Sequence, residues 1–144
     1  MIFEVIQIIA EQVNNYLEEI GLEKTVVPVN IAFLESQSND IDDPLKDGVA
    51  LTLINIHEEA ALKNFPNHTV ENTKTIYRNS IINLNLYLLF SANRDKYINS
   101  LNDISKIIEF FQGKKLFTQA NTIYNRNSSA MSNVDNFRFT DEIY

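Results

Sequence analysis

The sequence predicts an α+β fold in which amphipathic helices cover one face of a small β-sheet. Apolar residues repeat at three- and four-residue steps in two segments, and strand-type patterns occupy the segments between and after them. The resulting order of helix, three strands, helix and strand is typical of an α+β domain. A length of 144 residues with 44% hydrophobic residues suits one hydrophobic core. We therefore expect residues 1–144 to form a single domain.

Residues 2–20 predict the first helix, and Gly21 can end it in a left-handed conformation. The opposite face of this helix carries four glutamates, which we interpret as a solvated face. Residues 25–34 are rich in β-branched side chains and predict a strand, and Pro28 within it indicates a position at the edge of the sheet. Residues 35–48 are polar and acidic and predict a surface loop.

The middle of the chain predicts two further strands and a second helix. Residues 49–56 are apolar on both faces, which favours a central strand, and residues 64–75 predict a polar connection. Residues 82–90 alternate strictly between apolar and other side chains, which predicts a strand with one buried face. Asn93 is expected to cap a helix that ends at Gly113. The core positions expected in this strand and helix are Leu84, Leu86, Leu88, Phe90, Ile108 and Phe111, and the same helical repeat contains Tyr97, Leu101, Ile104 and Ile107.

The C-terminal part predicts short elements. Residues 116–124 and 134–139 favour strands, and residues 140–142 resemble the start of a helix, with an N-cap followed by acids. This start is interrupted at Tyr144. We therefore expect the chain to be a shortened version of a longer one.

The composition argues against several classes of function. The chain has no cysteine, which removes thiol catalysis, thiolate zinc sites and disulfides. Its net charge of −7 disfavours nucleic acid as a partner, because binding to phosphates depends on Lys and Arg. The N-terminus lacks a basic signal region, and no apolar run approaches the roughly 18 residues of a membrane span. We expect no secretory signal and no direct membrane insertion.

No histidine motif for metal binding is complete. The segment that begins at His57 starts like the zinc motif H-E-x-x-H, but Ala61 stands where the second histidine is needed. His57 comes at the end of a predicted strand, and His68 lies in a polar segment. We interpret both as structural or exposed histidines.

The acidic segment and the glycines do not form known sites. An EF-hand loop starting at Asp40 would need Gly and Glu where Leu45 and Leu51 stand. The three glycines are too far apart for a phosphate-binding loop. We therefore expect no catalytic, cofactor-binding or metal-ligating residue, no cofactor and no enzymatic activity. The alternative that we rank last is a hydrolase with a carboxylate pair drawn from Asp42, Asp43, Glu58 and Glu59.

The charges are unevenly distributed along the chain. Residues 1–60 hold 12 acids and 2 bases, a net charge of −10, whereas residues 61–144 hold 7 acids and 10 bases, a net charge of +3. One interpretation is that both halves contribute to one mixed surface. The other is a head-to-tail contact, in which an acidic surface of one copy meets a basic surface of the next, and such contacts can close into rings.

Several segments together carry a family resemblance that covers about residues 1–125. Its most specific parts are the strand Asn-Leu-Tyr-Leu-Leu-Phe-Ser-Ala-Asn at residues 85–93 and the helix end Phe-Phe-Gln-Gly at residues 110–113. The first helix with its following strand and residues 49–64 add to it. The chain resembles the N-terminal domain of tail-terminator, or cap, proteins of phage-tail-like contractile injection systems, of the antifeeding prophage and virulence cassette type.

The resemblance implies a small mixed β-sheet with helices packed on one face, similar to phage tail terminators. It also implies a further C-terminal helix and strand after residues 137–140, which we expect this chain to lack. It implies a noncatalytic structural role, in which copies of the chain form a ring, expected to be hexameric, that terminates the tube and sheath. The implied partners are other copies of the chain and the inner tube and sheath proteins. We expect synthesis in the bacterial cytoplasm and incorporation into a tail-like particle that can be released extracellularly.

An alternative function from a different class stays open. The chain could be a monomeric adaptor or cargo-handling module of the same system that holds a basic partner on an acidic face. A salt-sensitive one-to-one complex would favour the adaptor, whereas a closed ring would favour the cap. For the cap, the strand that contains Pro28 is the edge that we expect to be available for strand addition to a neighbour.

Overall fold

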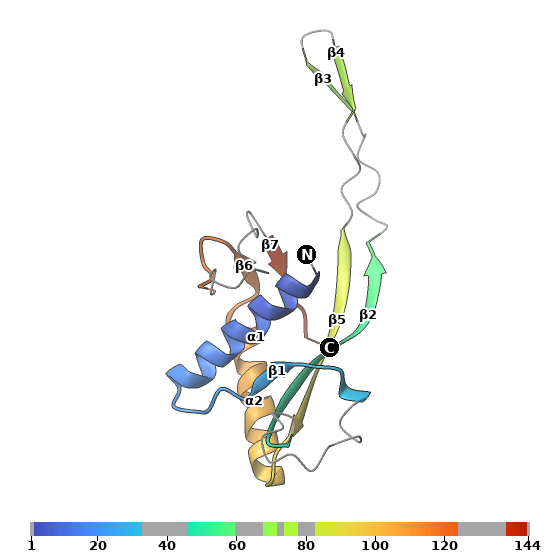
Figure 1. Ribbon diagram of the computed structural model, residues 1–144. Coiled ribbons are helices and arrows are strands. Elements are labelled where there is room, and N and C mark those ends of the chain that lie inside the picture. The colour runs from blue at the N-terminus through green and yellow to red at the C-terminus, as the bar shows by residue number, and fades with distance from the viewer. Residues whose placement is uncertain are drawn as a thin grey trace. The chain divides into compact units, whose positions relative to one another are not determined.

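The computed structural model describes residues 2–32, 46–59, 68–71, 74–77, 83–123 and 138–143. The elements are α1 (Ile2–Glu19), β1 (Val26–Pro28), β2 (Gly48–Glu58), β3 (His68–Glu71), β4 (Lys74–Tyr77), β5 (Leu84–Asn93), α2 (Tyr97–Gly113), β6 (Leu116–Thr118) and β7 (Arg138–Thr140) (Figure 1). They fall into two compact units. Residues 1–52 and 89–144 form the first unit, and residues 53–88 form the second. The α+β class predicted from the sequence is confirmed.

Helix α1 begins and ends close to its predicted limits. Its buried face contains Ile8, Ile9, Ala10, Val13 and Leu17. Gly21 has a φ of 81°, and its N–H donates to the Glu18 carbonyl at 3.0 Å. The N–H of Leu22 donates to the Leu17 carbonyl at 2.8 Å. These two bonds form the helix end that requires a left-handed residue, so the predicted role of Gly21 is confirmed.

The main sheet has the strand order β1-β2-β5. Strand β1 is parallel to β2, with Val26 opposite Val49 and Pro28 opposite Leu51. The predicted edge position of Pro28 and the central position of β2 are therefore confirmed. Strand β1 is shorter than predicted, and the Asn14 side chain of α1 holds it through two bonds: Nδ2 donates to the Val26 carbonyl at 2.8 Å, and Oδ1 accepts the Val26 N–H at 3.0 Å.

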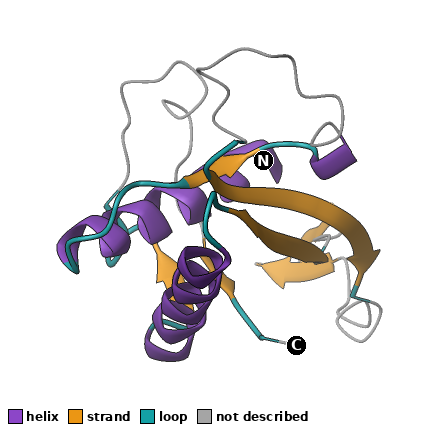
Figure 2. Cartoon of the chain, turned by 90° about the horizontal axis from the view of Figure 1, so that it is seen from below, coloured by secondary structure: helices purple, strands orange, loops and turns teal. Residues whose placement is uncertain are grey.

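Figure 2 shows the backbone of the helices and strands from below. In the first unit, aromatic rings join the two helices to the strands. Tyr16 of α1 meets Phe110 of α2 at a ring distance of 5.4 Å, and Phe90 of β5 meets Phe111 of α2 at 5.6 Å. Phe117 of β6 is fully buried beside both of these phenylalanines of α2. Its other neighbour is Phe139 of β7, at 4.9 Å and nearly parallel. The core of this unit thus combines these rings with a larger set of buried aliphatic side chains from α1, β1 and β2.

Two predicted helix starts are wrong. Asn93 ends β5, and the N-cap of α2 is Lys96, whose side chain makes no capping bond. Residues 140–142 do not start a helix, because Thr140 pairs with Leu116 in the antiparallel ladder of β6 and β7, and the Asp141 N–H donates to the Lys115 carbonyl at 3.2 Å. Pairing with a distant strand therefore decides the conformation there.

The second unit is built from β-strands. It holds residues 53–58 of β2, residues 84–88 of β5, and the antiparallel pair β3 and β4, in which His68 lies opposite Tyr77. The predicted polar connection at residues 64–75 is therefore wrong in part, because it contains β3. Among the side chains that the structure describes in this unit, none is buried.

Candidate interaction surfaces

Among the candidate site residues of the sequence, the side chains that the structure describes are those of His57, Glu58 and Glu59, and they do not form a site. His57 is exposed on β2, where its Nε2 lies 2.9 Å from Asn55 Nδ2 and its ring packs edge-on against Tyr87 at 5.5 Å. Glu58 is exposed at the end of β2 and Glu59 follows it. The backbone of His68 lies in β3. Residues 40–44, with Asp42 and Asp43, lie outside the described residues.

The described residues contain neither a cluster of metal ligands nor a helix that could span a membrane. In the described ranges, no group of three or more His, Cys, Asp or Glu side chains is placed to hold a metal ion. Over the same part of the chain, no helix combines the length and the apolar character needed to cross a membrane.

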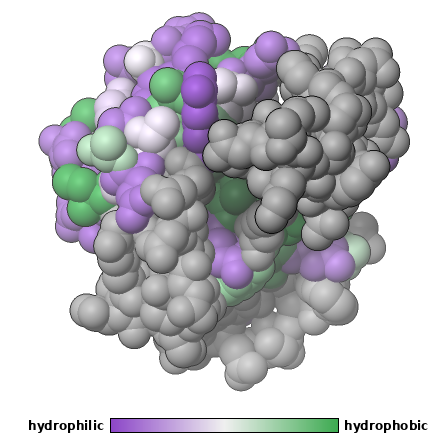
Figure 3. All heavy atoms as spheres, turned by 90° about the horizontal axis from the view of Figure 1, so that it is seen from above, coloured by the Kyte–Doolittle hydropathy of each residue, from purple (hydrophilic) through white to green (hydrophobic). Residues whose placement is uncertain are grey.

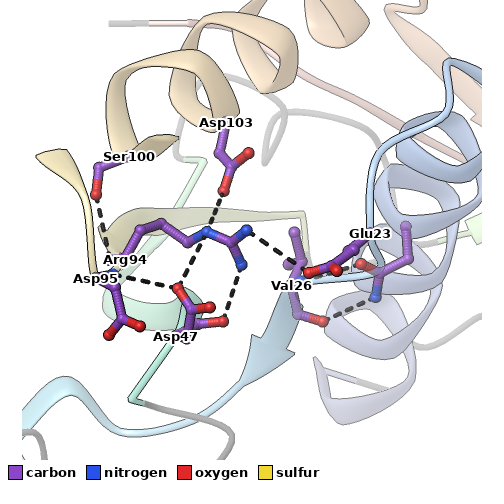
Figure 4. A network of polar contacts seen from close by, with 8 residues as sticks. Glu23, Val26, Asp47, Arg94, Asp95, Ser100 and Asp103 are labelled. Carbon is purple, nitrogen blue, oxygen red and sulfur yellow. Dashed lines mark hydrogen bonds and ion pairs between the residues drawn. The ribbon is translucent and has the colours of Figure 1, made fainter. Parts of the chain in front are cut away.

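The most extensive polar cluster described surrounds the Arg94 guanidinium, which follows β5 (Figure 4). Its Nε lies 3.3 Å from Asp103 Oδ2 and 3.3 Å from Asp47 Oδ1, and its Nη2 lies 3.7 Å from Glu23 Oε2. Its Nη1 also donates to the Asp47 carbonyl at 2.9 Å. The backbone N–H of Arg94 donates to Ser100 Oγ at 3.2 Å. One side chain therefore connects α2, the turn before β2, and the segment between α1 and β1.

Burial sets the electrostatics of this cluster. The side chains of Arg94 and Asp103 are only 11% and 7% exposed, whereas that of Glu23 is 81% exposed. Burial raises the pKa of Asp103 above its ordinary value of 3.8; the Arg94 guanidinium opposes this rise, and the carboxylates of Asp47 and Glu23 add to it. A polar pocket of about 210 Å³ borders the cluster. The cluster therefore has a structural role, because it holds three segments of the first unit together. The feature of the sequence that could have indicated it is a single acid, Asp103, within the helical pattern of residues 97–113.

Helix α2 exposes an apolar surface formed by part of the helical repeat predicted from the sequence. Tyr97 is 76% exposed, Leu101 is 49% exposed and Ile108 is 40% exposed, and Ile104 between them is half-buried. These four residues, which we call the α2 stripe, have the spacing of one helical face. The predicted core position of Ile108 is therefore wrong.

The face of α2 that is buried has a different composition. It contains Ser100, Asp103, Ile107, Phe110 and Phe111, so the predicted core position of Phe111 is confirmed. Ser100 Oγ accepts the Arg94 N–H, Asp103 pairs with the Arg94 guanidinium, and Phe110 and Phe111 pack against the other rings of the core. With this face buried, the α2 stripe lies at the surface.

A second exposed apolar surface lies on the ribbon formed by β2 and β5 in the second unit. Glu59 Oε2 accepts a bond from Asn85 Nδ2 at 3.0 Å, and His57 contacts Tyr87, so these four side chains share one face. Because side chains alternate along a strand, the other face carries apolar residues from both strands. We call this set the ribbon face: Ile54, Ile56, Leu84, Leu86 and Leu88.

The ribbon face is the predicted buried face of the strand at residues 82–90. Ile54 is 58% exposed, Ile56 is 43% exposed and Leu84 is 37% exposed, while Leu86 and Leu88 are half-buried. The prediction that these leucines are core positions is therefore wrong for the single chain. Phe90, the next residue of the series, is half-buried against Phe111.

Apolar atoms at the surface are a general property of this chain. On the face drawn in Figure 3, green hydrophobic atoms lie exposed among purple hydrophilic ones. Large exposed apolar patches on soluble proteins mark sites of interaction with other molecules. The α2 stripe and the ribbon face are therefore the candidate functional surfaces.

Comparison with known families decides the affiliation of this chain. The family model described as the Pvc16 N-terminal domain matches residues 4–140. The chain belongs to the Pvc16 N-terminal domain family. Membership associates the chain with Pvc-type, phage-tail-like contractile injection systems, which confirms that part of the resemblance. No curated protein matches the sequence of this Pvc16 N-terminal domain.

Proposed function

We propose that this Pvc16 N-terminal domain is a noncatalytic structural component that terminates the tube and sheath of a contractile injection system as a hexameric ring. Its partners are other copies of the chain and the inner tube and sheath proteins. The observation that carries the proposal is the family match over residues 4–140. The exposed α2 stripe and ribbon face support it, because an assembly protein needs apolar surface for its neighbours.

The mode of action follows from repetition. Contacts between single copies can be weak, yet a closed ring makes each copy bind two neighbours, and attachment to a tube end then engages all copies together. The particle containing the ring is expected to form in the bacterial cytoplasm, from where it can be released.

The test is the mass of the native chain in solution over a range of protein and salt concentrations, with negative-stain imaging of the same fractions. We expect closed rings of six copies, or rings that form when purified tube and sheath ends are added. A chain that stays monomeric and does not bind these ends contradicts the proposal. A salt-sensitive one-to-one complex with a basic protein would instead support the adaptor function.

A further inference from the structure

We propose that the ribbon face of one copy receives the α2 stripe of a second copy of this chain. The inference rests on the proposed function, because it names the contact that would join neighbouring copies in the ring. It assigns an apolar surface on each side of that contact and predicts that the contact is head-to-tail.

The first argument is that a helix of the same chain, α2, covers one end of β5. Phe90 belongs to the same alternating series as Leu84, Leu86 and Leu88, and its ring lies 5.6 Å from that of Phe111 on α2. A helix therefore covers this side of β5 at Phe90. The leucines of the series remain half-buried or exposed, so the same kind of element, a helix with an apolar face, suits them.

The second argument is the shape of the α2 stripe. Its four side chains repeat at steps of four, three and four residues, which gives one continuous apolar strip along the helix. Two of its members, Tyr97 and Leu101, are about half exposed or more, and the helix uses its other faces for the core and for solvent. Packing such a strip on an apolar sheet face is a standard layer arrangement.

The third argument is charge. The described side chains of the ribbon include the carboxylates of Glu58 and Glu59 and contain no Lys or Arg. By the same alternation, Glu58 lies on the ribbon face and Glu59 on the opposite face. Two ribbon faces packed together would therefore bring the Glu58 carboxylates of both copies near each other, which opposes that pairing. The α2 stripe carries no charge, and the exposed Asp95 and Lys96 before it have opposite charges. A helix from a second copy is therefore an occupant that does not repel Glu58.

The two surfaces together define the symmetry. Each copy offers one ribbon face and one α2 stripe, and these are different surfaces, so the contact is heterologous. A heterologous contact repeats from copy to copy and ends only when a ring closes.

The test uses two variants that each disable one surface: Ile56→Glu on the ribbon face and Leu101→Glu on the α2 stripe. We expect each variant alone to raise the apparent dissociation constant for assembly by about 100-fold, as for a central interface residue. Mixed in equal amounts, they retain one intact surface each. We expect the mixture to form a one-to-one heterodimer and nothing larger, measured by native mass spectrometry and sedimentation velocity.

Matched controls place the same charge on exposed residues outside these surfaces. Tyr87→Glu lies on the opposite face of the ribbon and is 40% exposed in the wild type, and Ile123→Glu replaces a side chain that is 83% exposed. Both are expected to assemble like the wild type, and circular dichroism checks that all four variants fold.

The outcomes separate this inference from the proposed function. Folded Ile56→Glu and Leu101→Glu chains that assemble like the wild type, or a mixture in which only one variant associates with itself, overturn the inference and leave the ring intact. A Tyr87→Glu chain as impaired as Ile56→Glu overturns the choice of ribbon face. A wild-type chain that assembles neither in solution nor on tube and sheath ends contradicts the proposed function itself.

Discussion

At the scale of single residues, the Arg94 side chain connects three segments of the first unit. It is nearly buried, and its closest buried partner is the equally buried Asp103. Burying a charge costs free energy, and the attraction between two buried opposite charges offsets that cost. Removing one partner of a buried pair therefore lowers the free energy of unfolding more than removing an exposed ion pair does. The more exposed carboxylates of Asp47 and Glu23 add less, because water screens them.

We predict that Arg94→Met lowers the free energy of unfolding by about 3 kcal/mol, because it leaves Asp103 buried without its guanidinium. Urea unfolding measures this change. The matched control is Lys106→Met, which removes the exposed ion pair with Glu109 at 2.7 Å and is expected to cost much less stability, because water screens this pair. Equal losses in the two variants would contradict a special role for Arg94.

Asp103 also predicts a dependence of stability on pH. Burial raises its pKa above 3.8 in the folded chain, so just above that pH the folded state binds more protons than the unfolded state. The contribution of Asp103 to stability therefore falls as pH rises from about 3.8 through the raised pKa. Relative to Asp103→Asn, which cannot titrate, the wild type should lose stability over this window. Parallel curves of unfolding free energy against pH would rule this out.

At the scale of elements, Gly21 provides a sharp test of the end of α1. Its φ of 81° is unfavourable for a residue with a Cβ, although no atom lies within 4 Å of where that Cβ would be. We predict that Gly21→Ala lowers the free energy of unfolding by about 1 kcal/mol through backbone strain alone. Thermal or urea unfolding measures it.

Gly113 serves as the control, because it is the last residue of α2 and a Cβ there also meets no atom within 4 Å. Gly113→Ala should leave stability unchanged or raise it by up to about 1 kcal/mol, since no left-handed conformation is required. A loss equal to that of Gly21→Ala would show that the conformation at Gly21 is not the cause.

The elements that could be predicted from the sequence are those whose causes are local. The repeat of residues 2–20 with Gly21, the edge position of Pro28 and the central strand all depend on spacing or on backbone chemistry, and the structure has them. The start of α2 and the end of β7 could not be predicted. The start of α2 at Lys96 comes two residues after Arg94, which contacts carboxylates that are distant in the sequence. Thr140 pairs with a strand more than 20 residues away.

The candidate surfaces could be predicted only as apolar series and not as exposed ones. An apolar series has the same pattern whether its cover comes from the same chain or from another molecule. Phe111 is buried within the chain, whereas Leu101 and Leu84 lie at the surface.

For the whole molecule, the two units should differ in how they respond to assembly. The first unit has an internal core around Phe117, whereas no described side chain of the second unit is buried, and a two-stranded ribbon has little stability of its own. Amides of the core, such as that of Ile107, are therefore expected to exchange slowly at any protein concentration. Amides of residues 53–58 and 84–88 are expected to exchange fast in dilute solution and to become protected on assembly.

Hydrogen exchange followed by mass spectrometry, at concentrations below and above the onset of assembly, measures this difference. If a second copy covers the ribbon face, protection should increase in residues 53–58 and 84–88 of the wild type and of Ile123→Glu, and should stay low in Ile56→Glu at the same concentrations. Protection of the ribbon that is already complete in the dilute monomer would contradict the prediction, because the cover would then come from the same chain. Protection that increases equally in Ile56→Glu would mean that assembly buries the ribbon through its other face.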